Sequence, residues 1–201
     1  MIDGPFRSVL PRYVRPLLRL YERRGVTPNQ ITAAGFGVAV VAALLVVTGW
    51  HALACGVWWL SRLLDGTDGI YARESGKVSD FGGYLDIVCD MGSYGVMVLG
   101  CAVYWPEWTV EWGVVLLLYT LCITSALALG ALEAKSGGGG ADNRTLRLGA
   151  GLAEGGETGL AYTLFLLWHA ATPVLLGVWI IVLAWTIVAR SVLAYRLFGG
   201  R

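Results

Sequence analysis

Long apolar runs separated by short polar segments are the dominant pattern of this chain. The runs are rich in Val, Leu, Ala and Trp, and each approaches the roughly 20 apolar residues that a helix needs to cross a bilayer. The pattern predicts six spanning helices, over residues 29–49, 52–72, 83–105, 111–133, 149–170 and 173–195. We therefore expect residues 1–201 to form a single all-α integral membrane domain, with a six-helix transmembrane bundle over 27–198.

The segment before the first run, residues 1–24, has a different pattern. Apolar side chains recur there at helical spacing between arginines, at Val14, Leu17, Leu18 and Tyr21. This pattern predicts an amphipathic helix that lies in the membrane interface with its arginines facing lipid phosphates, and the alternative is a solvated basic arm. Thr27, followed by Pro28, is expected to cap the start of the first span.

Composition supports the membrane assignment, and the distribution of charge predicts the topology. Of the 201 residues, 56% are hydrophobic and 14% are charged, against about 25% charged in a typical soluble domain. All 15 Lys and Arg fall on one side of the predicted topology. The positive-inside rule then places both termini and the basic loops in the cytoplasm, with the protein in the cell (inner) membrane. No nucleic-acid partner is expected.

Four aspartates stand out because acids are rare in such a chain. Asp65 and Asp68 are three residues apart at the end of the second predicted span, and Asp86 and Asp90 are four apart at the start of the third. Residues three and four apart share a helix face. If the turn between the spans folds the two helices onto each other, the four carboxylates converge at the cytoplasmic edge of the bilayer.

Four carboxylates in a partly apolar site repel one another unless cations neutralise them. Hard oxygen ligands suit Mg²⁺, Mn²⁺ or Ca²⁺, and two such ions about 4 Å apart are a common device for phosphoryl chemistry. Gly66, Gly69, Gly82 and Gly83 leave room beside the acids for a phosphate or nucleotide. The sequence therefore predicts a site for divalent metal ions, with room for a phosphate or nucleotide beside it.

The spacing of these residues resembles the signature of the CDP-alcohol phosphatidyltransferases. In chain order its fixed positions are Asp65, Asp68, Gly69, Ala72, Arg73, Gly82, Asp86 and Asp90. The stretch Thr27-Pro28-Asn29-Gln30-Ile31-Thr32 is similar to the way that members of this family begin their first span.

The resemblance implies an enzyme that transfers a substituted phosphate from a CDP-linked alcohol, such as CDP-diacylglycerol, to an acceptor hydroxyl and releases CMP. It implies that the four aspartates hold two ions, Mg²⁺ or Mn²⁺, and that Asp90 is also the catalytic base. Gly69, Ala72, Arg73 and Gly82 would line the nucleotide site together with Asp68. A homodimer in contact with membrane lipid is also implied.

The acceptor is less clearly indicated. Arg144, Arg147 and Arg190 would suit an acceptor that carries phosphate, such as inositol phosphate or glycerol phosphate, or they could anchor lipid headgroups. Glu154 and Glu157 would suit the amine of serine, ethanolamine or choline, or a polyol, or they could pair with those arginines. The stretch that contains both glutamates is similar to a bacterial subgroup whose acceptor the resemblance does not identify.

Two other classes of protein also use acidic residues in membranes. A metal-ion or proton transporter would hold carboxylates near mid-bilayer and contain an inverted repeat, but the acids here cluster at one edge and no repeat is visible. A prenyl-type transferase would carry two acidic motifs far apart in sequence, and this chain has one cluster.

Overall fold

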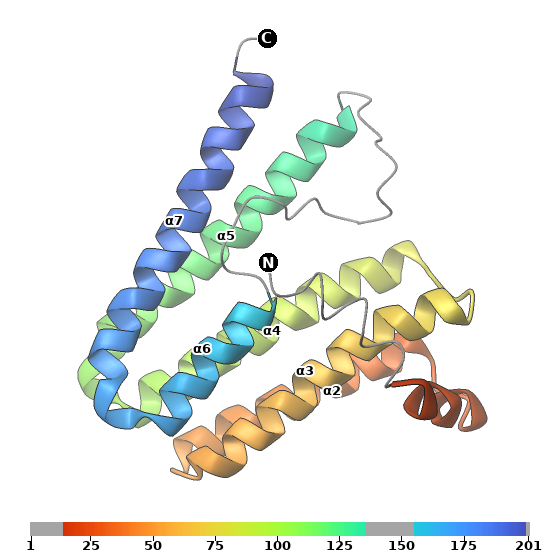
Figure 1. The fold of residues 1–201 in the computed structure, drawn as a ribbon, viewed down its shortest axis with the longest axis horizontal. Helices are drawn as coiled ribbons and strands as arrows, with labels where there is room; N and C mark the ends of the chain where they lie inside the picture. Colours follow the sequence, from red (N-terminus) through yellow and green to blue (C-terminus); the bar gives the residue numbers. More distant parts are fainter. Residues whose placement is uncertain (1–13, 136–154, 200–201) are drawn as a thin grey trace.

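The computed structural model describes residues 14–135 and 155–199, and every element within these ranges is helical. Residues 14–23 form a first helix. The long helices that follow are α2 (Pro28–Val47), α3 (His51–Glu74), α4 (Asp80–Tyr104), α5 (Thr109–Lys135), α6 (Gly155–Leu167) and α7 (Thr172–Phe198). Two short 3-10 helices, η1 (Pro106–Trp108) and η2 (His169–Ala171), precede α5 and α7 (Figure 1).

The helix starts follow local capping chemistry. α2 begins as expected, because Thr27 and Gln30 form a reciprocal capping box and Pro28 occupies the first turn. α4 begins at Asp80 rather than at 83, because the Ser79 hydroxyl accepts a hydrogen bond from the Gly82 N–H at 3.0 Å. The apolar run alone therefore placed this start too late. The first residues of the predicted fifth span, 149–154, lie outside the described residues.

Within residues 14–135 and 155–199, four helical segments are long and apolar enough to cross a membrane. They are Pro28–Val47, Asp80–Tyr104, Pro106–Lys135 and His169–Phe198. Charged side chains interrupt the second half of α3, and α6 has only 13 described residues. The prediction of six spans therefore stays a prediction.

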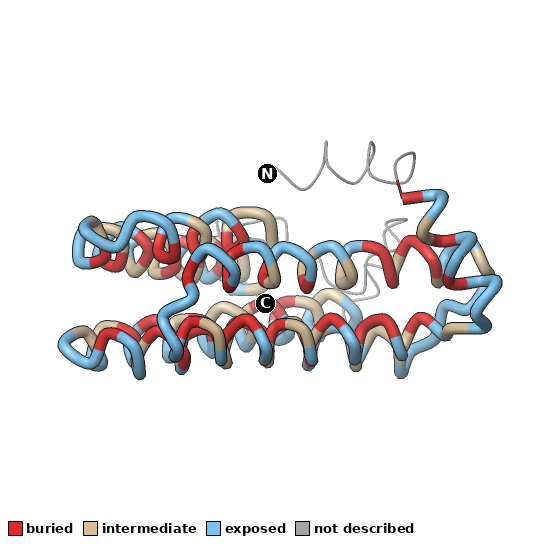
Figure 2. Tube along the Cα trace, turned by 90° about the horizontal axis from the view of Figure 1, so that it is seen from below, coloured by how far each residue is buried: buried red, intermediate tan, exposed pale blue. Residues whose placement is uncertain are grey.

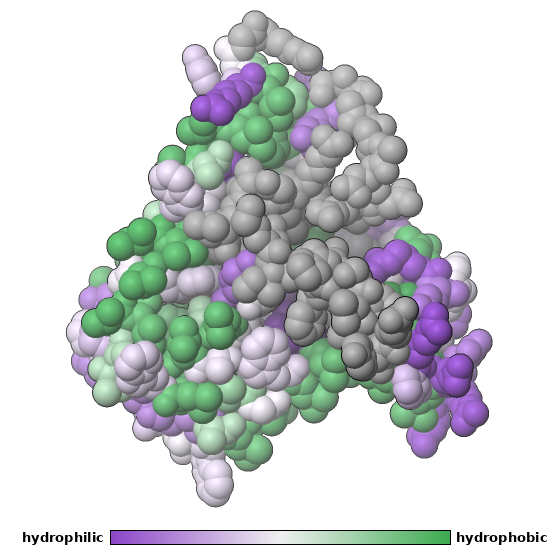
Figure 3. Space-filling view, viewed as in Figure 1, coloured by the Kyte–Doolittle hydropathy of each residue, from purple (hydrophilic) through white to green (hydrophobic). Residues whose placement is uncertain are grey.

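The outer surface of the helices is apolar. Val110, Val174 and Ile181 are each at least 68% exposed, and hydrophobic side chains cover much of the face seen in Figure 3. Water would make such a surface prone to association, whereas lipid chains are a compatible solvent. The chain is a membrane protein.

The helices form two groups. α2 packs against both α3 and α4, α5 packs against α7, and α6 contacts α3 and α7. In Figure 1 the two groups meet where α4 turns into α5 and α6 turns into α7, and the pair α5–α7 diverges from α2–α4 away from that end. Figure 2 shows that the buried residues lie on the helix sides that face one another.

Small residues let α2 lie close to two neighbours at once. A Cβ added to Gly100 of α4 would lie 2.9 Å from the carbonyl oxygen of Ala43, so only glycine fits this crossing. On the other side, the Ser61 hydroxyl of α3 donates to the Gly35 carbonyl at 2.8 Å. α3 and α4 make few direct backbone contacts with each other. α3 and α4 therefore approach each other mainly through their side chains, with α2 packed against both.

The helix over residues 14–23 packs against the start of α2 and the end of α3. Its apolar side chains Val14, Leu18 and Tyr21 are at most 8% exposed and pack in a cluster with Ile31, Ile70 and Tyr71. This packing is inconsistent with a solvated arm over these residues. Placement of the helix in the lipid headgroup layer stays a prediction.

Candidate active site

The four signature aspartates come from the second half of α3 and the first half of α4. Helical spacing puts Asp65 and Asp68 on one face of α3, and Asp86 and Asp90 on one face of α4. Asp65 and Asp90 approach each other across the two helices, because both contact Nη1 of Arg62. The four side chains differ in burial: Asp68 is only 4% exposed, whereas Asp86 is exposed. One aspartate of each pair is thus joined through Arg62, and the convergence of all four carboxylates stays a prediction.

Asp68 accepts one hydrogen bond from the start of α2 and one from its own helix. The Thr32 hydroxyl, itself 5% exposed, donates to one carboxylate oxygen, and the Gly69 N–H donates to the other at 2.5 Å. Thr32 is the last residue of the stretch that begins with Thr27. The two sequence features that pointed to the same family are therefore joined by a direct contact.

Arg62 extends from α3 across to α4. Its Nη1 contacts Asp90 Oδ1 and lies 3.5 Å from Asp65 Oδ2, and its Nη2 donates to Ser61 Oγ at 3.1 Å. The guanidinium carbon lies 4.6 Å from the ring centre of Trp58 and 5.3 Å from that of Tyr94. A buried cation thus sits among the carboxylates.

Of the predicted nucleotide-site residues, Gly69, Ala72 and Arg73 lie in the last turns of α3 and Gly82 lies in the first turn of α4. A Cβ on Gly69 would lie 3.3 Å from Nη1 of Arg73, so the missing side chain lets this guanidinium fold back along the helix. A Cβ on Gly82 would lie 3.1 Å from Ser79 Oγ and 3.2 Å from Asn29 Oδ1. Ala72 is half-buried. Arg73 is exposed, so its guanidinium can reach a phosphate.

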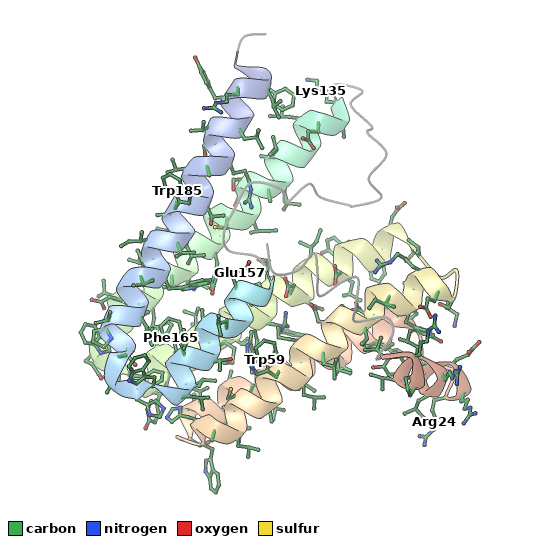
Figure 4. All side chains as sticks on the ribbon, in the orientation of Figure 1. Arg24, Trp59, Lys135, Glu157, Phe165 and Trp185 are labelled. Carbon is green, nitrogen blue, oxygen red and sulfur yellow. The ribbon has the colours of Figure 1, made fainter. Side chains whose placement is uncertain are left out.

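The predicted acceptor residues are only partly described. Arg190 of α7 is 4% exposed and donates to the Cys122 carbonyl at 2.5 Å and to Ser125 Oγ at 3.0 Å, both on α5. Glu157 is half-buried in the first turn of α6 (Figure 4). Arg144, Arg147 and Glu154 lie outside the described residues.

The donor set of this site fits a divalent metal in its chemistry. Four carboxylates supply hard oxygen atoms, which Mg²⁺ and Mn²⁺ prefer. Among the described residues, no three side chains are already arranged as a metal-binding group. Instead, Arg62 contacts Asp65 and Asp90 and supplies positive charge between α3 and α4.

The eight signature positions fall within the range of a known protein family. The model of the CDP-alcohol phosphatidyltransferase family matches residues 25–193, which include every signature position. The chain belongs to this family, and it is a transferase of phospholipid biosynthesis. Membership decides against the transporter and the prenyl-type transferase.

Among curated relatives, the chain is 36% identical over 182 residues to the inner membrane protein YnjF of Escherichia coli, covering 85% of this chain and 87% of that one. It is 31% identical to the archaetidylinositol phosphate synthase of Pyrococcus horikoshii, covering 89% of each chain. It is 30% identical to the phosphatidylinositol phosphate synthase of Mycobacterium marinum, covering 87% of this chain and 76% of that one.

Two solved structures of the phosphatidylinositol phosphate synthase of Mycobacterium tuberculosis are similar in fold. The structure with CDP-DAG bound has a TM-score of 0.68 and 25% identity, covering 92% of this chain and 94% of that one. The structure in complex with manganese and citrate has a TM-score of 0.64 and 26% identity, covering 90% and 88%.

Two site residues were not identified from the sequence. Thr32 was noted only as part of a helix start, and Arg62 only as one of the cations on the cytoplasmic side. A signal existed for Arg62, since it lies one helical turn before Asp65 and so shares its face. No comparable signal existed for Thr32, because its partner Asp68 is on another helix.

Proposed function

We propose that this enzyme transfers a phosphatidyl group from CDP-diacylglycerol to the hydroxyl of a small polar acceptor and releases CMP. The observation that carries the proposal is the complete family signature, whose four aspartates lie on α3 and α4 within the residues that the family model matches. The choice of donor draws on the M. tuberculosis relative that was solved with CDP-DAG bound.

Each signature residue has a role in this proposal. Asp65, Asp68, Asp86 and Asp90 hold two divalent ions, Mg²⁺ or Mn²⁺, and the manganese in a relative supports this choice. When bound, the ions neutralise the donor diphosphate and stabilise CMP as the leaving group. Gly69, Ala72, Arg73 and Gly82 line the cytidine nucleotide site beside Asp68.

Asp90 acts on the acceptor. As the acceptor oxygen forms its bond to phosphorus, the Asp90 carboxylate takes the hydroxyl proton. The bond between phosphorus and the CMP oxygen breaks, and its electron pair leaves with CMP. The reaction takes place at the cytoplasmic face of the membrane, and the enzyme works as a homodimer.

The preferred acceptor is a phosphorylated polyol. The positive charge that recognises its phosphate comes from Arg144, Arg147 and Arg190. Two relatives support this choice, since they are named a phosphatidylinositol phosphate synthase and an archaetidylinositol phosphate synthase. A second candidate is an amino alcohol. Glu157 lies in the first turn of α6, Glu154 precedes it by three residues, and their carboxylates could receive the amine of such an acceptor.

The test is CMP release by purified enzyme in detergent with CDP-diacylglycerol and Mn²⁺ or Mg²⁺. Inositol phosphate, glycerol phosphate, serine, ethanolamine and choline are supplied one at a time. We expect CMP only with a phosphorylated acceptor and none after chelation of the metal. Turnover with an amine acceptor alone would transfer the proposal to the second candidate.

A matched pair of variants tests the site itself. Asp90→Asn should reduce CMP release by at least about a thousandfold, because it removes both a ligand and the base. Asp80→Asn is the control, since Asp80 is an exposed acid at the start of the same helix and is not part of the signature. Activity that survives Asp90→Asn and fails in Asp80→Asn would refute the assignment.

A further inference from the structure

Arg62 is a buried cation whose contacts are directed inwards. Only 8% of its side chain is exposed, although most cations of this chain lie at helix ends and in loops. A cation that anchors a helix reaches outwards to lipid phosphates. The Arg62 guanidinium instead reaches from α3 to Asp90 on α4 and also lies near Asp65.

Two aromatic rings hold the guanidinium in this position. Trp58 is fully buried and Tyr94 is 4% exposed, and each ring lies within cation–π distance of Arg62. Tyr94 belongs to α4, and its carbonyl accepts a hydrogen bond from the Tyr162 hydroxyl of α6 at 2.9 Å. The position of Arg62 is therefore set by packing between three helices.

The pairing of Arg62 is strong but incomplete. Its Nη atoms contact carboxylates and a hydroxyl, whereas its buried Nε has no hydrogen-bond partner in the part of the chain that the structure describes. A partly satisfied buried cation is easier to displace than one whose donors are all paired. The two carboxylates that it contacts belong to the set proposed to bind metal.

We infer that Arg62 is a resident counter-ion of the carboxylate cluster, a positioning residue that holds Asp65 and Asp90 together and competes with divalent metal for them. The inference rests on the proposed metal-binding role of these aspartates. Before metal arrives, the guanidinium offsets the repulsion between carboxylates of α3 and α4. When metal binds, Arg62 gives up part of these contacts, and this competition lowers the affinity of the site for the ion.

The test measures Mn²⁺ binding to purified protein without any substrate, by electron paramagnetic resonance of the free ion. Arg62→Gln should bind Mn²⁺ about tenfold more tightly than the natural protein, because a unit positive charge next to the ligands is gone. Arg62→Lys, which keeps the charge and loses the planar fork, should fall between the two. Arg196→Gln removes an exposed cation at the end of α7 and should leave the affinity unchanged.

The Mn²⁺ dependence of thermal unfolding supplies a second readout that a purely structural role would not change. Without metal, Arg62→Gln should unfold at a lower temperature than the natural protein, and saturating Mn²⁺ should close most of that gap. Equal loss of stability with and without Mn²⁺, together with unchanged or weaker Mn²⁺ affinity, would overturn the inference while leaving the proposed function intact. If the natural protein itself binds no Mn²⁺, the proposed two-metal function fails, and this inference fails with it.

Discussion

The Thr32 hydroxyl donates a hydrogen bond to the Asp68 carboxylate and so ties the first turns of α2 to the signature on α3. Both groups are nearly inaccessible, and hydrogen bonds to buried charged groups are among the strongest that side chains form. The relationship makes Thr32 a positioning residue for Asp68.

Replacing Thr32 by Val should therefore weaken catalysis while keeping the shape of the side chain. Loss of a hydrogen bond to a charged group is worth about 1.5–3 kcal/mol, so kcat/KM for CMP release should fall roughly tenfold to a hundredfold. Thr48→Val is the matched control, because the Thr48 hydroxyl donates to the Leu44 and Leu45 carbonyls at the exposed end of α2, away from the signature. Equal activity of the two variants would exclude a positioning role for Thr32.

Gly82→Ala should impair the nucleotide site. The new methyl group would lie 3.1–3.2 Å from the Ser79 and Asn29 side chains, so the α4 cap or the start of α2 must shift. We expect a several-fold rise in KM for the CDP-linked donor. In contrast, Gly56→Ala meets nothing within 4 Å and should be neutral or stabilising by up to about 1 kcal/mol. An unchanged KM in Gly82→Ala would show that the close approach has no bearing on the nucleotide.

Gly100→Ala should destabilise the crossing of α2 and α4. Its methyl group would lie 2.9 Å from the backbone carbonyl oxygen of Ala43, which cannot move as a flexible side chain can. Overpacking of this kind costs about 1–3 kcal/mol, and it should lower the unfolding temperature measured in detergent. Gly113→Ala, on a stretch of α5 with open space around it, provides the comparison. Identical unfolding temperatures for both variants would contradict the close packing described above.

His51 should make the stability of the protein sensitive to acid. It is the first residue of α3 and is 7% exposed. The centre of its ring lies 4.4 Å from that of His169, and the ring stacks on Trp105. Burial, and then the nearby His169, lower the pKa of His51 below 6.5, since both disfavour the charged imidazolium. The unfolded chain binds this proton more readily, so stability is fully present above about pH 6.5 and falls as the pH drops through the lowered pKa.

The check is the unfolding temperature between pH 7.5 and about pH 5, a range set by the ordinary histidine pKa. His51→Phe keeps an aromatic ring in the stack and should reduce the decline on acidification. If the natural protein and His51→Phe lose stability in parallel as the pH falls, His51 is not the source of the acid sensitivity.

Local patterns carried much of the correct prediction. The apolar runs located the long helices, because burial in a bilayer or a core demands continuous hydrophobic stretches. Thr27 and Pro28 gave the start of α2 because capping depends on a few adjacent residues. Ser79 performs the same task for α4, but the polar residues after it do not belong to the apolar run, so that start was placed too late.

The sequence by itself determined the chemistry of the site. Spacings of three and four residues put Asp65 with Asp68, and Asp86 with Asp90, on shared helix faces whatever the rest of the fold does. The signature and its glycines then identified the family and the class of reaction.

Only the tertiary structure decided how these faces meet. Helical periodicity says which residues share a face, but it does not say which helix that face contacts, because the contact depends on crossing points far apart in sequence. Close approach at Gly35 and Gly100 places α2 against both α3 and α4. That placement brings Thr32 to Asp68 and leaves Arg62 to bridge to Asp90, and neither contact could be read from the spacing of residues along one helix.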